Sequence, residues 1–253
     1  MRGVGDFDDK VVVVTGAGSG LGRASAMGFA SAGASVVVAD VDEETGTATA
    51  RAIEAADGDA HFLRTDVSDE DSVRRMVEAT LDRYGRLDCA HNNAGVSPWT
   101  GDTTQTTRAD WDVILGVNLT GVWQCMKHEI PAMREAGGGA IVNTSSGSGL
   151  IGVANQPAYV ASKWGVVGLT RAAALEFAAD DIRINCICPG AMLTPLTKQK
   201  FGLMYGEEDL RNASPMKRFG EVEEVAAAAI WLCSDAASFV DGAALPVDGA
   251  SSA

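Results

Sequence analysis

The sequence predicts an α/β protein in which helices cover both faces of a mainly parallel, seven-stranded sheet. Two observations support this fold class: seven short runs rich in Val, Ile and Ala alternate with longer amphipathic segments, and these runs are apolar at consecutive positions. Strands of that composition are typical of a parallel sheet that is buried on both faces. The alternation indicates a doubly wound sheet, with any ligand beyond the carboxyl ends of the strands.

The elements follow one another in a regular order. The candidate strands are Val11–Val14, Ser35–Ala39, His61–Arg64, Leu87–His91, Ala140–Thr144, Arg183–Cys188 and Ala244–Val247. The candidate helices are 20–32, 43–57, 69–84, 107–135, 158–179 and 221–234. Ser68 and Asp42 stand where the N-caps of two of these helices are expected, and both residue types are good caps.

The chain contains no internal repeat and no interdomain linker, so we expect residues 1–253 to form a single domain. One stretch, 191–218, differs from the rest. It holds no candidate strand, includes Pro195 and Pro215, and has a mixed apolar and charged composition. A connection of this length predicts a substrate lid.

The composition excludes several functions. A net charge of −14, without a local cluster of Lys and Arg, disfavours binding to nucleic acid or to anionic membranes. No apolar window is long enough to span a bilayer, and the acidic stretch 1–10 lacks the pattern of a signal peptide, so we expect a cytoplasmic protein.

The five cysteines and three histidines indicate no metal site. The cysteines lack paired C-x-x-C spacing and the histidines are isolated from one another. We therefore expect reduced, mostly buried cysteines and structural histidines.

A glycine-rich loop, Thr15–Gly22, follows the first strand and opens the first helix. Its pattern is T-G-x-x-x-G-x-G, which departs from G-x-G-x-x-G at Leu21 and lacks the Lys-Ser/Thr of a P-loop. Glycine permits a close approach of the backbone to phosphates, and the N–H groups at a helix start attract negative charge. The loop predicts dinucleotide binding by Gly16, Ser19, Gly20, Leu21 and Gly22.

Asp40 closes the second strand, at the distance from the loop where an acidic residue reaches the hydroxyls of the adenosine ribose. Asp42 is the better cap for the helix that begins at Glu43, which leaves Asp40 for the ribose. Neither Ser19 nor Val41 offers a cation to a 2′-phosphate, so the sequence favours NAD over NADP as the cofactor.

Tyr159 and Lys163 are the candidate acid/base pair. Four residues apart on a helix, they share one face, and a nearby cation stabilises a phenolate. We therefore expect Lys163 to lower the pKa of Tyr159. The alternative to an acid/base role is that Tyr159 and Lys163 make only an ordinary i, i+4 contact on a helix surface. Ser146 follows the fifth strand and can donate a hydrogen bond to a substrate oxygen, whereas Ser145 and Ser148 are expected to form only a serine turn.

Together these motifs resemble the single-domain branch of the short-chain dehydrogenase/reductase family over essentially the whole chain. The resemblance implies a Rossmann-type fold and hydride transfer between a nicotinamide and a secondary alcohol or ketone. The matching residues are the Thr15–Gly22 loop, Asp66, Asn92–Gly95, Asn118, Ser146, Tyr159, Lys163, Pro189, Gly190 and Thr194.

The resemblance also implies roles for residues outside the first loop. It implies that Asp66 and Val67 hold the adenine, and that Lys163 also binds the nicotinamide ribose. Asn118 is implied to position a proton-relaying water, and a local helix kink is the alternative account of this residue. The residues implied to support the central nucleotide and the nicotinamide are Asn93, Ala94, Gly95, Pro189, Gly190, Met192 and Thr194.

The mechanism expected for ketone reduction has Ser146 and Tyr159 polarise the oxygen, and Tyr159 donate the proton. The absence of G-x-S-x-G disfavours a serine hydrolase. Two alternatives remain: reduction of a 3-oxoacyl thioester, and a catalytically silent NAD-binding protein. Trp99, Ser148, Val153 and Asn155 are candidate linings of the substrate pocket. By resemblance, the apolar segments 107–135 and 158–179 imply a homotetramer.

Overall fold

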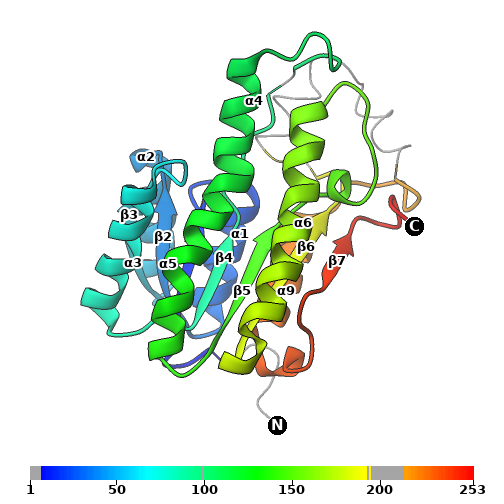
Figure 1. Ribbon diagram of the computed structural model, residues 1–253. Helices are drawn as coiled ribbons and strands as arrows, with labels where there is room; N and C mark the ends of the chain where they lie inside the picture. The colour runs from blue at the N-terminus through cyan, green and yellow to red at the C-terminus, as the bar shows by residue number, and fades with distance from the viewer. Residues whose placement is uncertain (1–6, 99, 193, 195–213) are drawn as a thin grey trace.

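The computed structural model describes residues 7–98, 100–192, 194 and 214–253. Its strands form one seven-stranded sheet with the order β3-β2-β1-β4-β5-β6-β7, and every pairing is parallel (Figure 1). This confirms the predicted fold class. The strands are β1 (Val11–Thr15), β2 (Ser35–Asp40), β3 (Asp59–Arg64), β4 (Cys89–Asn92), β5 (Gly139–Thr144), β6 (Ile182–Pro189) and β7 (Ala244–Val247).

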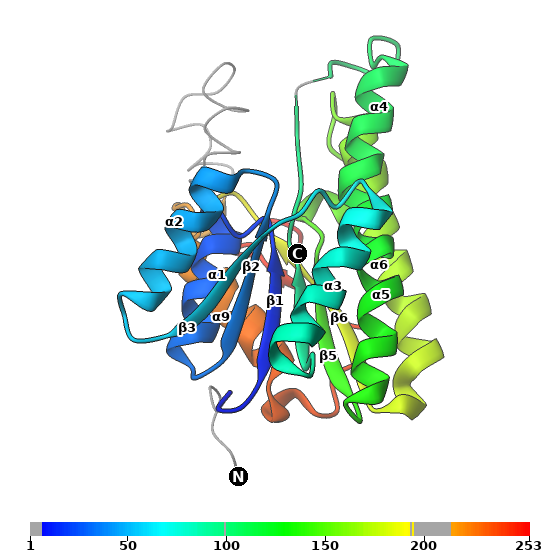
Figure 2. The same ribbon diagram turned by 90° about the vertical axis from the view of Figure 1, so that its left-hand side faces the viewer.

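Helices cover both faces of the sheet, as Figure 2 shows. On one face lie α1 (Gly20–Ser31), α2 (Glu43–Glu54) and α9 (Val222–Cys233). On the other face lie α3 (Glu70–Tyr84), α5 (Gly121–Glu135) and α6 (Pro157–Phe177). A shorter helix, α4 (Arg108–Leu115), precedes α5 in the same long arm of chain.

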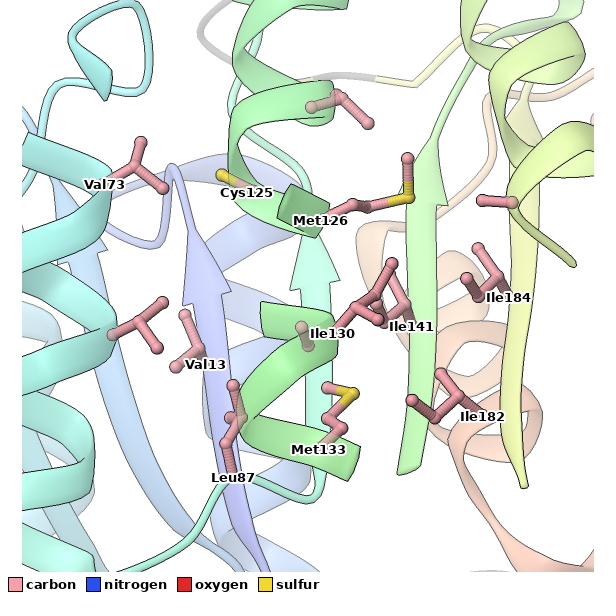
Figure 3. Packing of buried hydrophobic residues seen from close by; sticks show 14 of the residues in the cluster. Val13, Val73, Leu87, Cys125, Met126, Ile130, Met133, Ile141, Ile182 and Ile184 are labelled. Carbon is pink, nitrogen blue, oxygen red and sulfur yellow. The ribbon is translucent and has the colours of Figure 1, made fainter. Parts of the chain in front are cut away.

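Each face of the sheet buries its own apolar cluster, because successive strand residues point to opposite faces. Val13 and Ile141 pack beneath α3, α5 and α6, where Met126 and Met133 fill the space between helix and sheet (Figure 3). Val12, Val14 and Val142 belong to the cluster under α1, α2 and α9. Burial on both faces accounts for strands that are apolar at consecutive positions.

The strand order reverses direction between β1 and β4, which pair from Val12–Cys89 to Val14–His91. Crossovers on the two sides of this boundary run to opposite faces, so the loops after β1 and β4 diverge and open a crevice. The carboxyl ends of β1, β2, β4, β5 and β6 are all at this edge of the sheet. The fold therefore gathers the predicted site segments in one place.

The long helix predicted at 107–135 is interrupted. α4 passes into a π-helical turn, η1 (Gly116–Thr120), before α5 begins. Asn118 lies in this turn and is fully buried. A local irregularity is therefore present at Asn118, in the form of a single π turn, which is frequent at functional sites.

The predicted cap of α3 is wrong by one residue. Asp69, not Ser68, is the N-cap, and its carboxylate accepts a hydrogen bond from Asp71 N at 3.1 Å. The Ser68 hydroxyl instead donates to Asp66 at 2.6 Å, since the acid two residues earlier is a charged and stronger acceptor. The predicted Asp42 cap of α2 is confirmed, because its side chain accepts from Thr45 N.

The lid predicted at 191–218 falls largely on residues 193 and 195–213, which lie outside the described residues. At its borders, Met192 forms a parallel bridge with Gly220, and Gly220 N donates to Ala191 O at 3.0 Å. No helix in the described part of the chain is both long and apolar enough to cross a membrane.

Candidate active site

A cleft of about 490 Å³ opens at the carboxyl edge of the sheet, between the loops that follow β1, β2, β3, β4, β5 and β6. Twenty site residues were predicted from the sequence. All of them line the cleft except Gly22 and Asn118, which stand behind its wall. Six lining residues were not predicted: Thr65, Ser68, Val96, Val117, Thr144 and Ser145.

The glycine-rich loop needs glycine for steric reasons at two positions. Gly16 has φ +64°, and a side chain there would come within 2.9 Å of Ala94 Cα. A side chain at Gly22 would collide with the carbonyl oxygen of Gly16. Gly22 therefore has a packing role, which allows α1 to begin directly against the loop.

The N-terminus of α1 differs from those of α2, α3 and α4. Asp42, Asp69 and Thr107 cap those helices with their side chains, but Ser19 makes no side-chain cap at α1. The first turn of α1 also contains no acidic residue. Uncapped N–H groups beside a cleft are a ready site for an anion such as a pyrophosphate.

Asp40 is held at the end of β2 by two backbone N–H groups. Its Oδ2 accepts from Gly18 N at 2.7 Å and its Oδ1 from Asp42 N at 3.0 Å. The carboxylate is thus tied to the glycine-rich loop. Val41 beside it is half exposed and lines the same cleft.

The Asn93-Ala94-Gly95 turn is fastened to the end of β1. The Thr15 hydroxyl accepts from the backbone N–H groups of Asn93 and Ala94 at 3.0 and 3.1 Å, and Asn93 Nδ2 donates to Thr15 O at 3.1 Å. The turn therefore joins the ends of two neighbouring strands. Gly95 brings the backbone close to Lys163, since a Cβ there would lie 3.6 Å from Nζ.

Asp66 and Val67 lie at the outer end of the cleft. Ser68 N and Oγ both donate to Asp66 Oδ1, which fixes this exposed carboxylate. Gln124 of α5 donates to Val67 O at 2.6 Å. The adenine pocket implied by the resemblance is thus supported by a helix residue that lies 57 positions further along the chain.

Lys163 is buried and is held at both ends by the loop that leaves β5. Its Nζ donates to Thr144 O at 2.9 Å, and the Ser145 hydroxyl donates to the Lys163 carbonyl at 2.8 Å. Its Nζ also lies 5.7 Å from the centre of the Tyr159 ring. Ser145, expected only in a turn, in fact anchors α6, and its burial against that helix is a tertiary contact without a local sequence signal.

The lowered pKa expected for Tyr159 is not found. Burial raises the pKa of Tyr159 above its ordinary value, and a hydrogen bond with Ser146 opposes that rise only in part. Lys163 Nζ lies over the ring face and bonds to Thr144 O. Ser146 and Tyr159 nevertheless stand together at the cleft, as predicted.

Asn118 acts through its side chain as a brace. Oδ1 accepts from Val96 N at 2.8 Å, and Nδ2 donates to Val96 O at 2.9 Å and to Ser162 Oγ at 3.3 Å. Ser162 in turn donates to Tyr159 O at 2.7 Å. The π turn therefore links the loop after β4 to the helix that carries the tyrosine. The water relay implied for Asn118 stays a prediction.

The segment after β6 forms the remaining wall through Pro189, Gly190, Met192 and Thr194. Gly190 packs on Asp248, since a Cβ there would lie 2.7 Å from the Asp248 Cα. Of the candidate substrate-pocket residues, Trp99 lies outside the described residues. Ser148, Val153 and Asn155 do not line this cleft.

Comparisons with known proteins agree with this geometry. A family described as enoyl-(acyl carrier protein) reductase matches residues 16–251. Levodione reductase from Leifsonia aquatica is 42% identical over 203 residues, which span 77% of this chain and 76% of that protein. Cyclohexanol dehydrogenase from Acinetobacter sp. (strain SE19) is 41% identical over 198 residues, spanning 78% and 77%.

Solved structures show the same likeness. A crystal structure of levodione reductase matches with a TM-score of 0.93 and 41% identity, covering 97% of this chain and 98% of that one. A 3-ketoacyl-(acyl-carrier-protein) reductase from Brucella melitensis, complexed with NADH, matches with a TM-score of 0.91 and 35% identity, covering 98% and 100%.

The chain belongs to the short-chain dehydrogenase/reductase family. It is an oxidoreductase that uses a nicotinamide cofactor and interconverts the CH–OH group of a secondary alcohol with a ketone.

Proposed function

We propose that this enzyme is an NAD-dependent dehydrogenase of cyclic secondary alcohols, with Tyr159 as its acid/base, and that it works in the reverse direction on the matching ketones. The observation that carries the proposal is the convergence of Ser146, Tyr159 and Lys163 on one cleft with Asp40. The first three supply the chemistry and the last one selects the cofactor.

The preference for NAD rests on Asp40 and its surroundings. Two backbone N–H groups fix its carboxylate, and a 2′-phosphate beside it would meet a like charge, which can cost several kcal/mol. Among the described residues that line the cleft, Lys163 is the only lysine or arginine, and it lies beside Tyr159. Apart from Lys163, the described lining residues thus supply no cation to offset the repulsion.

The residues present fit a dinucleotide. The uncapped start of α1 suits the pyrophosphate, Asp40 suits the ribose hydroxyls, and Asp66 with Val67 suits the adenine. When bound, the nicotinamide supplies the hydride chemistry, and the protein supplies orientation and electrostatics.

The chain's own groups handle the oxygen and its proton. Ser146 and Tyr159 donate hydrogen bonds to the ketone oxygen, and the Tyr159 Oη proton moves to that oxygen as the alcohol forms. Lys163 holds the nicotinamide ribose and lies over the tyrosine ring. Asn118 keeps the loop after β4 aligned with α6 and orders a water for proton exchange with solvent.

The proposed substrate class is supported by the names of relatives. Cyclohexanol dehydrogenase is named for a six-membered ring alcohol and matches most of this chain. A specific observation favours a second candidate, the 3-oxoacyl thioester, because a 3-ketoacyl-(acyl-carrier-protein) reductase shares the fold over nearly the whole chain.

Initial rates separate these candidates. NAD reduction is followed with cyclohexanol, 2-hexanol and a 3-hydroxyacyl-CoA, each with NAD and with NADP. We expect kcat/KM for cyclohexanol with NAD to exceed that for 2-hexanol by about tenfold, the scale that a shaped apolar pocket provides. A thioester turned over faster than cyclohexanol would favour the second candidate. No turnover of any alcohol would contradict the proposal.

We further propose a homotetramer in a reducing, cytoplasmic compartment. Trp111, Trp123, Trp164 and Leu175 expose apolar surface on α4, α5 and α6, which supports contacts between copies of the chain. All five cysteines are buried and unpaired, which supports the compartment. Light scattering tests the assembly, and Trp164→Glu should shift it toward smaller species, whereas Arg171→Glu on the same helix serves as a charge control.

A further inference from the structure

His91 and Thr144 form a buried hydrogen bond between adjacent strands. His91 of β4 is fully buried, and its Nε2 lies 2.9 Å from Thr144 Oγ1 at the end of β5. In the parallel register His91 pairs with Val142, so the two strand neighbours that share its face, Val142 and Cys89, belong to an apolar cluster. A polar pair at this position is not needed to fill the core.

The direction of the hydrogen bond follows from the state of the ring. Burial lowers the pKa of His91 to about 3, so the imidazole is neutral at physiological pH and only one nitrogen carries a proton. Nδ1 is buried and has no hydrogen-bond partner in the described part of the chain. A bare acceptor is tolerated there more readily than an orphaned N–H. Nε2–H therefore donates to Thr144.

Thr144 stands between His91 and the catalytic lysine. Its side chain bonds to His91 on the face that α1 and α9 cover, and its carbonyl accepts Lys163 Nζ at 2.9 Å from the side of α6. Thr144 pairs with Ile187 of β6, but the ladder on the β4 side ends at Asn92–Asn143, so the His91 bond holds the residue on that side. The aim of its carbonyl is fixed as a result.

We propose that His91 is a positioning residue for catalysis, because it locks Thr144 so that the Thr144 carbonyl holds Lys163 Nζ against Tyr159. Lysine has a flexible four-carbon stem and loses much rotamer entropy when it is held. Ser145 anchors the lysine backbone and Thr144 anchors its amine, so the His91 bond completes a rigid support. This inference depends on the proposed role of Lys163.

The test compares Thr144→Val with Thr144→Ser in the NAD-loaded enzyme. Valine keeps the shape and the backbone carbonyl of Thr144 but removes the acceptor for His91. We expect kcat for cyclohexanol oxidation to fall about tenfold, the scale at which residues that orient a functional group act. The rise of kcat with pH should move to higher pH, since a misplaced lysine stabilises the phenolate less. Serine should recover most of the lost rate.

His91→Phe tests the other partner, and Val142→Ala is the matched control. His91 and Val142 lie in the same buried layer, but Val142 is outside the active-site cleft and makes no hydrogen bond to Thr144. Val142→Ala should lower Tm because of its cavity and leave the pH profile unchanged. If Thr144→Val and His91→Phe change only Tm, as the control does, the inference fails.

The two proposals fail in different ways. A wild-type enzyme that oxidises no cyclic alcohol with NAD would contradict the proposed function. An active wild type whose Thr144→Val and His91→Phe variants keep the wild-type kcat and pH profile would overturn only the role of His91. Should Thr144→Val fold poorly, His91→Gln, which retains a side-chain donor, should keep more activity than His91→Phe, and equal loss in both would also overturn that role.

Discussion

The two halves of the cleft are built differently. In the nucleotide half, formed by β1, β2 and α1, backbone N–H groups hold the functional carboxylate: Asp40 accepts from Gly18 N and Asp42 N. In the catalytic half, contacts between α6 and neighbouring elements hold the catalytic side chains. Lys163 depends on Thr144 and Ser145, and α6 depends on Asn118 through Ser162.

The difference teaches what holds each part of a site. A loop defined by glycine sterics and an uncapped helix start presents backbone N–H groups, and these need only a correctly folded backbone. Catalytic side chains on a helix need a surrounding shell that fixes their rotamers. The two halves should therefore respond separately to mutation.

Tyr159→Phe is expected to give the largest difference between the effects on the two halves of the cleft. The ring and its packing stay, so fold and NAD affinity in the nucleotide half should be kept. Loss of the proton carrier should lower kcat by about 10²-fold or more, the typical value of general acid–base catalysis. Steady-state kinetics measures kcat, and a fluorescence titration with NADH measures the affinity for the cofactor. Retention of more than about a tenth of the activity would contradict the assignment.

The direction of the Tyr159 pKa shift gives a further check on the same residue. Alcohol oxidation requires phenolate, and burial raises the pKa of Tyr159, so phenolate is the minor form at neutral pH. The kcat for oxidation should then rise with pH from about 7 to about 10 without a plateau, while reduction, which uses the phenol, should stay level over that range. If kcat for oxidation instead reached a plateau near neutral pH, a bound group would be stabilising the Tyr159 phenolate.

Asp40→Ala should act on the nucleotide half alone. Wild-type discrimination between NAD and NADP is expected to be about 100-fold in kcat/KM, which corresponds to about 2.8 kcal/mol. Removing the carboxylate should narrow that ratio by raising the efficiency with NADP, while kcat with NAD changes less. If the wild type had equal kcat/KM with NAD and with NADP, Asp40 would not select between the two cofactors.

Glu129→Gln should change stability and leave both halves of the site working. Glu129 is buried in α5, its Oε2 accepts from Asn92 Nδ2 at 2.9 Å, and burial raises its pKa to about 7. Because the folded pKa lies above the unfolded value, the folded state binds the extra proton. The wild type should then lose stability as pH rises from about 4.5 to about 7.

The glutamine variant lacks this titration. Between about pH 5 and pH 8, the wild type should lose on the order of 2 kcal/mol relative to Glu129→Gln. Urea unfolding at a series of pH values measures the difference, with Glu78→Gln on exposed α3 as the control. If the difference in unfolding free energy between Glu129→Gln and the wild type did not change with pH, the ionised Glu129 carboxylate would be better stabilised in the folded protein than its burial indicates.

The parts that depend on period, turn chemistry and motif could be predicted from the sequence. All seven strands were found within two residues at each end, because burial on both faces leaves a direct signal of consecutive apolar residues. The cleft residues followed from motifs at strand ends. The α3 cap was misplaced because Ser68 and Asp69 are both good caps, and only the bond to Asp66 decides between them.

The missed features depend on tertiary contacts. Ser145 sits in a serine-rich turn, and its bond to the Lys163 carbonyl exists only once α6 packs on β5. The raised pKa of Tyr159 reflects burial within the assembled cleft, which the i, i+4 spacing to Lys163 could not reveal. The position of Asn118 suggested a kink, but its bonds to Val96 and Ser162 require the fold.

The strand order also has a consequence for synthesis of the chain. β1 is the first strand to be synthesised, yet it lies in the middle of the finished sheet. The edge of β1 that pairs Val12 with Cys89 stays unpaired until β4 has been synthesised. At ordinary translation rates this leaves a valine-rich edge unpaired for roughly 4–15 s. An unpaired apolar edge recruits other chains. We expect slower translation to worsen aggregation and chaperone supply to relieve it, whatever the stability of the finished enzyme.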